Sequence, residues 1–110
     1  MTHEMRLDPI PFAAIARGEK TVEMRLYDEK RRAITVGDSI LFRERGGSGF
    51  LVATVVDLHL FPTFRELYAT IPKTYLGYRA DEEASPEDME LYYSLADQKS
   101  YGVVGIEISL

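Results

Sequence analysis

The segment "GEKTVEMRL", residues 18–26, alternates apolar and polar side chains with a period of two, which is typical of a β-strand. Val22 and Met24 lie on one face of such a strand, and Glu23 and Arg25 lie on the other, because successive side chains point to opposite sides. The apolar face predicts contact with a hydrophobic core. The charged face points either to water or into a binding site.

The segment before this strand, "DPIPFAAIARG", predicts a short helix over residues 8–18. Asp8 can cap the helix, the two prolines suit its first turn, and Gly18 suits the left-handed position that ends it. The strand is therefore expected at about residues 20–27, directly after a tight turn. A charged loop, "YDEKRR", is expected to follow it.

The middle of the chain predicts a β-hairpin. The segment "ITVGDSILFRE" turns at Gly37-Asp38 and continues as a strand, and "RGGSG" at residues 45–49 is a hairpin turn because glycine accepts a positive φ at little cost. The returning strand, "FLVATVVDLHLF", contains enough β-branched residues to lie in the centre of a sheet.

Two helices and a closing strand are expected after the hairpin. Thr63 and Glu66 form a capping-box pattern that starts a helix ending at about Ile71, before Pro72. A final helix is predicted to open with Ser85 as its N-cap, and "YGVVGIEISL" closes the chain as a strand. The predicted order is β-α-β-β-β-α-α-β, which indicates one α+β domain over residues 1–110 with a mixed or mainly antiparallel, barrel-like sheet.

The composition is that of an ordinary globular protein, with 45% hydrophobic and 28% charged residues and no cysteine. We expect no membrane segment, no secretory signal and no disulfide, and therefore a cytoplasmic location. The net charge of −5 is unevenly distributed: residues 1–79 hold 12 Lys and Arg against 10 Asp and Glu, whereas residues 80–110 hold 1 against 8. A local basic surface is therefore compatible with the acidic total, although "KRR" at residues 30–32 also suits a solvated turn.

The run "ARGEKTVEMRLYDEKRRAITVGDSILF" resembles the ASCH domain, the activating-signal-cointegrator homology family of the PUA-like superfold. The family's G-x-K-x-x-E-x-R segment matches Gly18, Lys20, Glu23 and Arg25, and its V-G-D turn matches residues 36–38. The closing "YGVVGIEI" is also similar, so the resemblance covers essentially the full chain. It implies a small PUA-like β-barrel flanked by short helices, with a cleft lined by Lys20, Glu23 and Arg25.

Relatives suggested by this resemblance include RNA or nucleotide binders, an N4-acetylcytidine amidohydrolase and ribonucleases. The amidohydrolase chemistry uses a lysine and, three positions later, a threonine nucleophile. Lys20 matches the lysine, but Glu23 occupies the threonine position, and no downstream glutamate clearly matches the acid or base. Glu23 as a general base beside Lys20 or Arg25 remains an alternative route to hydrolysis.

The seven tyrosines suggest stacking on unpaired bases, because aromatic faces bind single-stranded nucleic acids in this way. Those expected on helices suit apolar stripes, namely Tyr68, Tyr92 and Tyr93. Those expected to rim the cleft lie in or beside loops, namely Tyr27, Tyr75, Tyr78 and Tyr101. Tyr27 is the leading candidate, because it continues the face of Glu23 and Arg25 by period two.

His3 and His59 are single histidines without metal-ligand spacing along the chain, so we expect no metal and no cofactor. A hydrogen-bonded or exposed imidazole is favoured for His59, which alternates with Leu58 and Leu60. Three functions remain open. The first is RNA or nucleotide binding by Lys20, Glu23, Arg25, Tyr27 and Tyr78; the second is a hydrolase using Lys20 and Glu23; the third is a protein-interaction module with a structural ion cluster.

Overall fold

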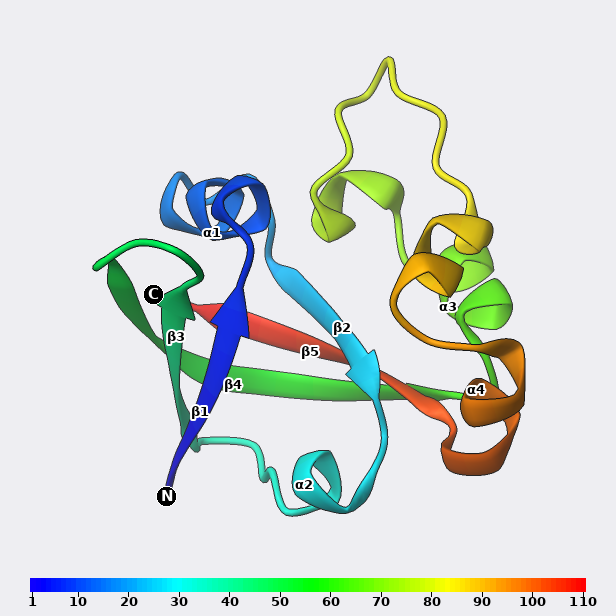
Figure 1. Ribbon diagram of the computed structural model, residues 1–110, viewed down its shortest axis with the longest axis horizontal. Helices are drawn as coiled ribbons and strands as arrows, with labels where there is room; N and C mark the ends of the chain where they lie inside the picture. The colour runs from blue at the N-terminus through cyan, green and yellow to red at the C-terminus, as the bar shows by residue number, and fades with distance from the viewer.

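The computed structural model describes residues 1–110 as a five-stranded sheet with short helices (Figure 1). The strands are β1 (Thr2–Leu7), β2 (Val22–Leu26), β3 (Ser39–Glu44), β4 (Phe50–Phe61) and β5 (Val103–Ser109). The α-helices are α1 (Pro9–Ala16), α2 (Glu29–Arg32), α3 (Phe64–Thr70) and α4 (Leu95–Tyr101). Two 3₁₀ helices, η1 (Lys73–Leu76) and η2 (Pro86–Leu91), connect α3 to α4.

The sheet is an open barrel with the strand order β1-β3-β4-β5-β2. β1 runs parallel to β3, and every other pair is antiparallel, so the predicted α+β class with a mixed, barrel-like sheet is confirmed. β1 and β2 are the two edges of the sheet and share no ladder of hydrogen bonds. We call the interval between them the seam.

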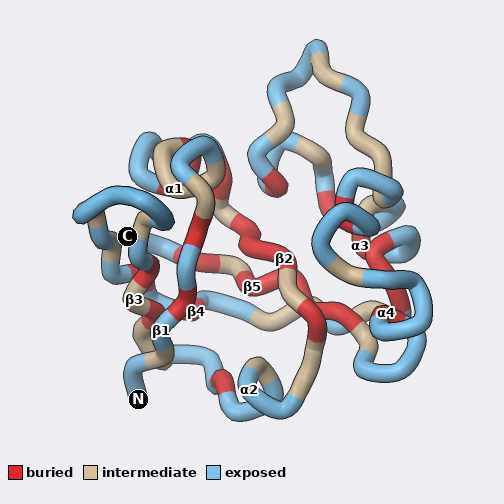
Figure 2. Tube along the Cα trace, in the orientation of Figure 1, coloured by how far each residue is buried: buried red, intermediate tan, exposed pale blue.

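Two hydrophobic cores lie on opposite faces of the sheet. The first fills the barrel with side chains from β1, β3, β4, β5 and α1, including Phe42 and Ile106, both fully buried. The second packs α3, η1 and η2 against the outer face of β2, with Phe64 and Leu67 at its centre. Val22 and Met24 belong to this second core, so the predicted apolar face of residues 18–26 is confirmed. Figure 2 shows buried residues concentrated along β2 and β5.

Most predicted elements are present at the expected places. The 8–18 helix is α1, followed by Gly18 with a φ of 75°, and the hairpin of residues 39–61 forms β3 and β4. The capping box is also confirmed, because the Thr63 backbone N–H donates to the Glu66 carboxylate at 3.1 Å at the start of α3.

Two predicted segments differ from the structure. The charged loop after β2 contains the single turn of α2, which Asp28 caps by accepting a hydrogen bond from the Arg31 N–H at 3.1 Å. The final helix is divided into η2 and α4, and the Ser85 side chain bonds Glu87 instead of capping. Ser94 caps α4 by accepting from the Asp97 N–H at 3.1 Å, so the helix restarts there. No helix is long and apolar enough to cross a membrane.

Candidate functional site

A cleft of about 140 Å³ opens at the seam, near the start of α1. It lies between the end of β1, the polar side of β2 and the η2 segment. Its walls are formed by Arg6, Leu7, Asp8, Pro11, Lys20, Glu23, Met24, Arg25, Arg45, Met89, Tyr92 and Tyr93. The predicted residues Lys20, Glu23 and Arg25 are thus brought together in one concave site.

The pairing of β2 with β5 fixes the direction of the charged side chains. Glu23 lies opposite Ile106, and Arg25 lies opposite Val104, and both β5 residues belong to the barrel core. Because opposite residues of an antiparallel pair share a face, Glu23 and Arg25 point to the barrel side of β2. They lie at the seam, because β2 is an edge strand and no strand pairs with its free edge. The charged face of residues 18–26 is therefore a partly enclosed site and not a solvated surface.

The three charged side chains form one ion cluster, which we call the seam triad: Lys20, Glu23 and Arg25. The Lys20 Nζ lies 3.0 Å from Glu23 Oε1, and the Arg25 Nη2 donates to Glu23 Oε2 at 2.9 Å. The exposed fractions of the three side chains are 9%, 5% and 12%. Since a buried charge requires a partner, each side chain of the triad is held by the others.

Glu23 is ionised within this cluster. Burial by itself would raise the pKa of the Glu23 carboxyl, but the charges of Lys20 and Arg25 outweigh burial and lower that pKa to about 2. A carboxylate with so low a pKa is a weak base at neutral pH, which disfavours the general-base role considered for Glu23. The cluster instead carries one net positive charge, on two cations that share one anion.

Arg25 also links the two edges of the sheet. Its Nη2 donates to the Arg6 carbonyl oxygen at 2.8 Å, so a side chain spans the interval that a backbone ladder leaves open. The Arg25 Nε and Nη2 groups donate within the protein, and the guanidinium also has the Tyr93 hydroxyl as a hydrogen-bonding neighbour. The guanidinium is therefore held in place from several sides in the wall of the cleft.

The stem of Lys20 is held by the segment after α3. The Thr21 N–H donates to the Tyr75 carbonyl oxygen at 3.0 Å, which attaches η1 to the start of β2. Gly77, with a φ of 103°, lies so close that a Cβ built there would be 3.2 Å from the Lys20 Cδ. Glycine at this turn therefore allows both the left-handed backbone and the close approach to Lys20.

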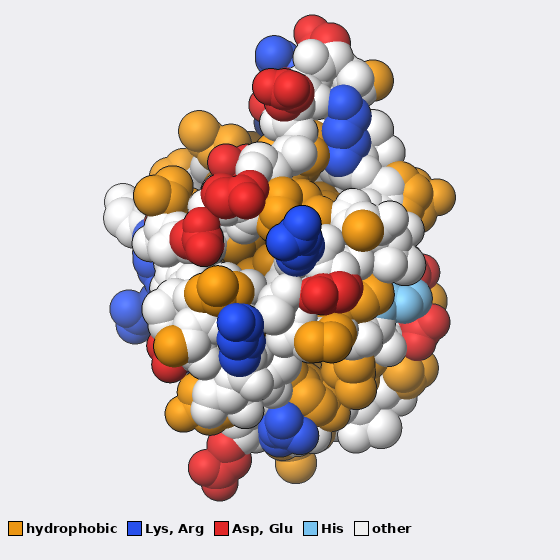
Figure 3. Space-filling view, turned by 90° about the vertical axis from the view of Figure 1, so that its right-hand side faces the viewer, with side chains coloured by type: hydrophobic (Ala, Val, Ile, Leu, Met, Phe, Trp, Pro, Cys, Tyr) orange, Lys and Arg blue, Asp and Glu red, His pale blue; other side chains and the backbone are white.

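A basic surface continues from the cleft along the seam. A neighbouring depression is lined by five cations, Arg6, Arg25, Lys30, Arg31 and Arg45, together with Glu4 and Met5. By contrast, the side of the molecule that carries α3 and α4 mixes acidic, basic and hydrophobic side chains (Figure 3). The local basic surface that the sequence allowed is therefore present, and it lies beside the seam triad.

The tyrosines are placed differently from the expectation. Tyr27 packs against the barrel core, and the guanidinium of Arg32 lies over its ring at 4.4 Å, outside the cleft. The Tyr78 hydroxyl bonds Asp88 at 2.7 Å and Tyr68 at 2.9 Å, also outside the cleft. Burial and these hydrogen bonds raise the pKa of Tyr78, so its phenol stays neutral.

Tyr92 and Tyr93, which the sequence assigned to an apolar helix stripe, line the cleft instead. Tyr93 stacks on Phe64 with ring centroids 5.8 Å apart, whereas 64% of Tyr92 is exposed. η2 ends at Leu91, so neither tyrosine lies on the helix that the sequence predicted. Arg6 and Arg45 are the other residues that sequence reasoning missed. Alternation in β1 could have placed Arg6 on the outer face, but only the strand order places it at the seam.

The fold and site define a class: a small α+β domain with an open mixed barrel and a buried Lys-Glu-Arg cluster at its seam. The chain belongs to the ASCH domain family, whose model matches residues 5–110. The resemblance inferred from residues 18–38 is thereby confirmed.

Two solved structures are similar over nearly the whole chain. The crystal structure of the hypothetical protein PH0355 is 34% identical, with a TM-score of 0.83, and the match covers 99% of this chain and 98% of that one. The solution structure of the protein PF0455 from Pyrococcus furiosus is 33% identical, with a TM-score of 0.72 and coverage of 99% and 96%. No curated protein matches the chain.

Proposed function

We propose that the seam cleft binds single-stranded RNA or a free nucleotide. In this proposal the exposed guanidinium groups of Arg6 and Arg45 contact phosphate oxygens, and the net positive charge of the seam triad attracts the anion. The Glu23 carboxylate holds the seam triad in place, and the exposed ring of Tyr92 provides a stacking surface for a base.

The observation that carries this proposal is the convergence of buried, mutually paired charges in a concave site that opens onto a basic surface. A cluster with only a structural role would need neither an opening nor the additional cations around the seam. Arg6 and Lys30 form no ion pair with a carboxylate of the chain, so their charges are available to an anionic ligand.

The size of the cleft limits what can enter it. Its volume of about 140 Å³ lies below the roughly 300–1,000 Å³ of pockets that enclose a whole drug-sized ligand. One base or one phosphate group matches this volume better than a folded nucleic acid does. The remainder of a bound strand would follow the basic surface lined by Lys30, Arg31 and Arg45.

Fluorescence anisotropy of a labelled single-stranded RNA decamer tests the proposal. Wild-type protein should bind with an affinity that falls steeply with salt concentration. Arg6→Ala and Arg45→Ala should each weaken binding and reduce the salt dependence, because each removes one phosphate contact. Tyr92→Ala should weaken binding by roughly tenfold, through the loss of base stacking.

Arg79→Ala is the matched control, because Arg79 is a 77% exposed arginine outside both basic depressions. Equal weakening by Arg79→Ala and Arg45→Ala would place binding elsewhere, and absence of salt-dependent binding by the wild type would refute the proposal. Chromatography of the RNA after incubation, repeated with acylated nucleosides, separates binding from hydrolysis. Turnover of RNA or of an acylated nucleoside by the wild type, with loss of that turnover in Arg25→Lys, would replace the binding function by a catalytic one.

A further inference from the structure

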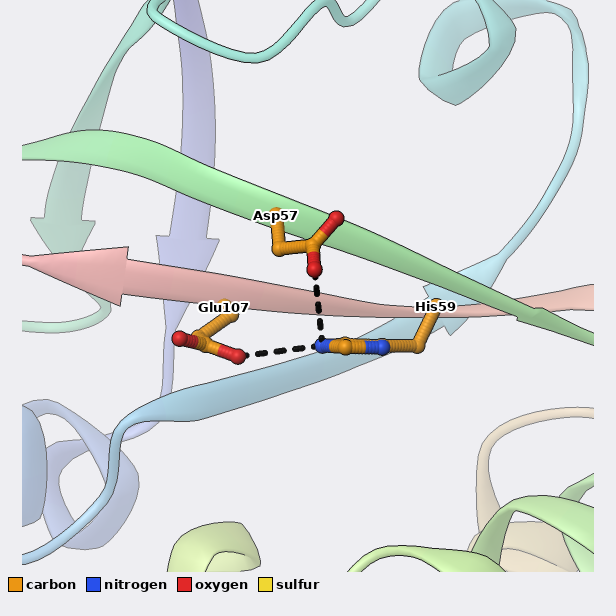
Figure 4. Close-up of side chains that lie close together, drawn as sticks. All are labelled: Asp57, His59 and Glu107. Carbon is orange, nitrogen blue, oxygen red and sulfur yellow. Dashed lines mark hydrogen bonds and ion pairs between the residues drawn. The ribbon is translucent and has the colours of Figure 1, made fainter.

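A second polar cluster lies on the outer face of the sheet, away from the seam. It consists of Asp57 and His59 on β4 and Glu107 on β5 (Figure 4). Glu107 pairs with Val22, whose side chain belongs to the second core, so the cluster lies on the opposite face of β2 from the seam triad. We call these three residues the outer triad, and none of them takes part in the proposed RNA binding.

The donor atoms of the outer triad converge. The His59 Nε2 lies 3.0 Å from Glu107 Oε1 and 3.8 Å from Asp57 Oδ2, as the dashed lines in Figure 4 show. One imidazole nitrogen and two carboxylate oxygens all lie within 4.8 Å of one another. Two donor atoms of one tetrahedral zinc are roughly 3.3 Å apart, given metal-ligand bonds of about 2.0–2.2 Å. The distance from His59 to Glu107 is below that value and the distance from His59 to Asp57 is above it. Small side-chain rotations would therefore bring the donor atoms to the spacing that zinc requires.

The backbone brings the two carboxylates close together. The register of β4 against β5 shifts between Val55 and Asp57, and this bulge sets Asp57 directly opposite Glu107. Two like charges directly opposite each other destabilise a sheet unless a cation lies between them. Neither carboxylate pairs with a lysine or arginine; His59 is the partner of both.

The surroundings also suit a ligand set. Asp57 Oδ1 accepts a hydrogen bond from the Leu58 N–H at 2.8 Å, which orients the carboxylate and leaves Oδ2 towards His59. Gly105 lies opposite His59 in the ladder, and the side chains of Ile71, Val22 and Leu67 fill the space above it, which gives the cluster an apolar wall on one side. About a third of the His59 side chain and 40% of the Glu107 side chain are exposed, which provides access for an ion and for water.

We infer that Asp57, His59 and Glu107 form a site for a divalent transition-metal ion, with Zn²⁺ as its best-matched member. A mixed set of imidazole nitrogen and carboxylate oxygen donors suits zinc, and three protein ligands leave one tetrahedral position open to water. The expectation of no metal rested on spacing along the chain, which does not reveal this cluster. His59 and Glu107 are 48 positions apart and meet only through the pairing of β4 with β5.

Titration calorimetry of tag-free, chelator-treated protein with zinc chloride tests the inference. One equivalent of Zn²⁺ should bind at neutral pH and raise Tm, because the site exists only in the folded chain. His59→Ala and Glu107→Gln should each weaken zinc binding at least tenfold and abolish the rise in Tm. Both residues are partly exposed, so the variants should remain folded, and circular dichroism checks this.

His3→Ala is the control, because His3 is the other histidine and bonds Asp38 at 2.7 Å near the N-terminus. It should leave zinc binding unchanged. Loss of binding in His3→Ala with retention in His59→Ala would overturn the inference, as would the absence of saturable binding by the wild type. Binding of calcium or magnesium with equal affinity would overturn the assignment to a transition metal, since those ions prefer all-oxygen ligand sets.

Discussion

At the scale of single residues, Glu23 has the central place in the seam. It is the only anion of the seam triad, and it accepts from both cations while its Oε1 also accepts from the Met24 N–H at 3.0 Å. Removing its charge leaves two buried cations without a counter-ion. Such a loss is far more costly than the loss of an exposed ion pair.

Glu23→Gln should therefore lower the free energy of unfolding by roughly 3–5 kcal/mol, since it breaks a buried ion cluster from one side. Urea denaturation followed by circular dichroism measures this change. Glu19→Gln is the control, because Glu19 pairs with Arg17 on the surface with 61% of its side chain exposed. Equal stability of Glu23→Gln and Glu19→Gln would contradict the account of the seam triad.

The sequence predicted the three charged residues of the cleft but not its tyrosines. The positions of Lys20, Glu23 and Arg25 follow from the alternation of one strand and from the family pattern. Tyr27 and Tyr78 were expected beside them, but neither lines the cleft, because alternation indicates the side on which a residue lies and not which neighbours it contacts. Tyr27 stays on the barrel side of β2, but its ring packs against the barrel core beneath the Arg32 guanidinium and does not line the cleft.

At the scale of elements, the segment of η1 and its following turn determines where Lys20 lies. The Tyr75 carbonyl oxygen accepts a hydrogen bond from the Thr21 N–H, which fixes the start of β2. Gly77 packs on the aliphatic stem of Lys20. The sequence analysis placed Tyr75 and Tyr78 in or beside loops, and it did not predict the contact of this segment with Lys20. Contacts between segments more than fifty positions apart do not appear in local patterns.

Gly77→Ala should lower stability by roughly 1–2 kcal/mol, because an L-residue is strained at a positive φ, and it should also displace Lys20. Gly37→Ala separates the two effects, since Gly37 has a φ of 96° but a Cβ added there would have nothing within 4 Å. Both variants should show a similar loss of Tm, measured by thermal denaturation. Only Gly77→Ala should weaken RNA binding in the anisotropy assay, and equal affinities of the two variants would contradict the role given to this turn.

At the scale of the whole molecule, the sheet separates the barrel core on one face from the second core on the other. The sequence predicted the class and most of the elements because capping residues, turn glycines and alternation are local signals. It did not predict that β2 would be an edge strand with one face in each environment. That position depends on the order β1-β3-β4-β5-β2, which arises from long-range pairing.

The same arrangement predicts a loss of stability in acid. The pKa of Glu23 is lowered from 4.5 to about 2, and that of Asp38 from 3.8 to about 2 by its hydrogen bonds to His3 and the Thr35 N–H. A depressed folded-state pKa stabilises the native protein above the unfolded pKa, and this stabilisation disappears as protons bind. Stability should therefore fall as pH decreases from about 4.5 to about 2, measured by urea midpoints at each pH. Glu23→Gln should show a shallower decline, and a decline as steep as that of the wild type would assign the acid sensitivity to other groups.

The seam is the one place where neighbouring strands of the barrel share no backbone ladder. Everywhere else the barrel wall is a continuous ladder, and widening it would break several backbone hydrogen bonds at once. At the seam the hydrogen bond from Arg25 to the Arg6 carbonyl oxygen takes the place of a ladder, beside the packing of the barrel core. We therefore expect local separation of the barrel wall to begin along the seam, because fewer hydrogen bonds cross it than cross any ladder of the sheet.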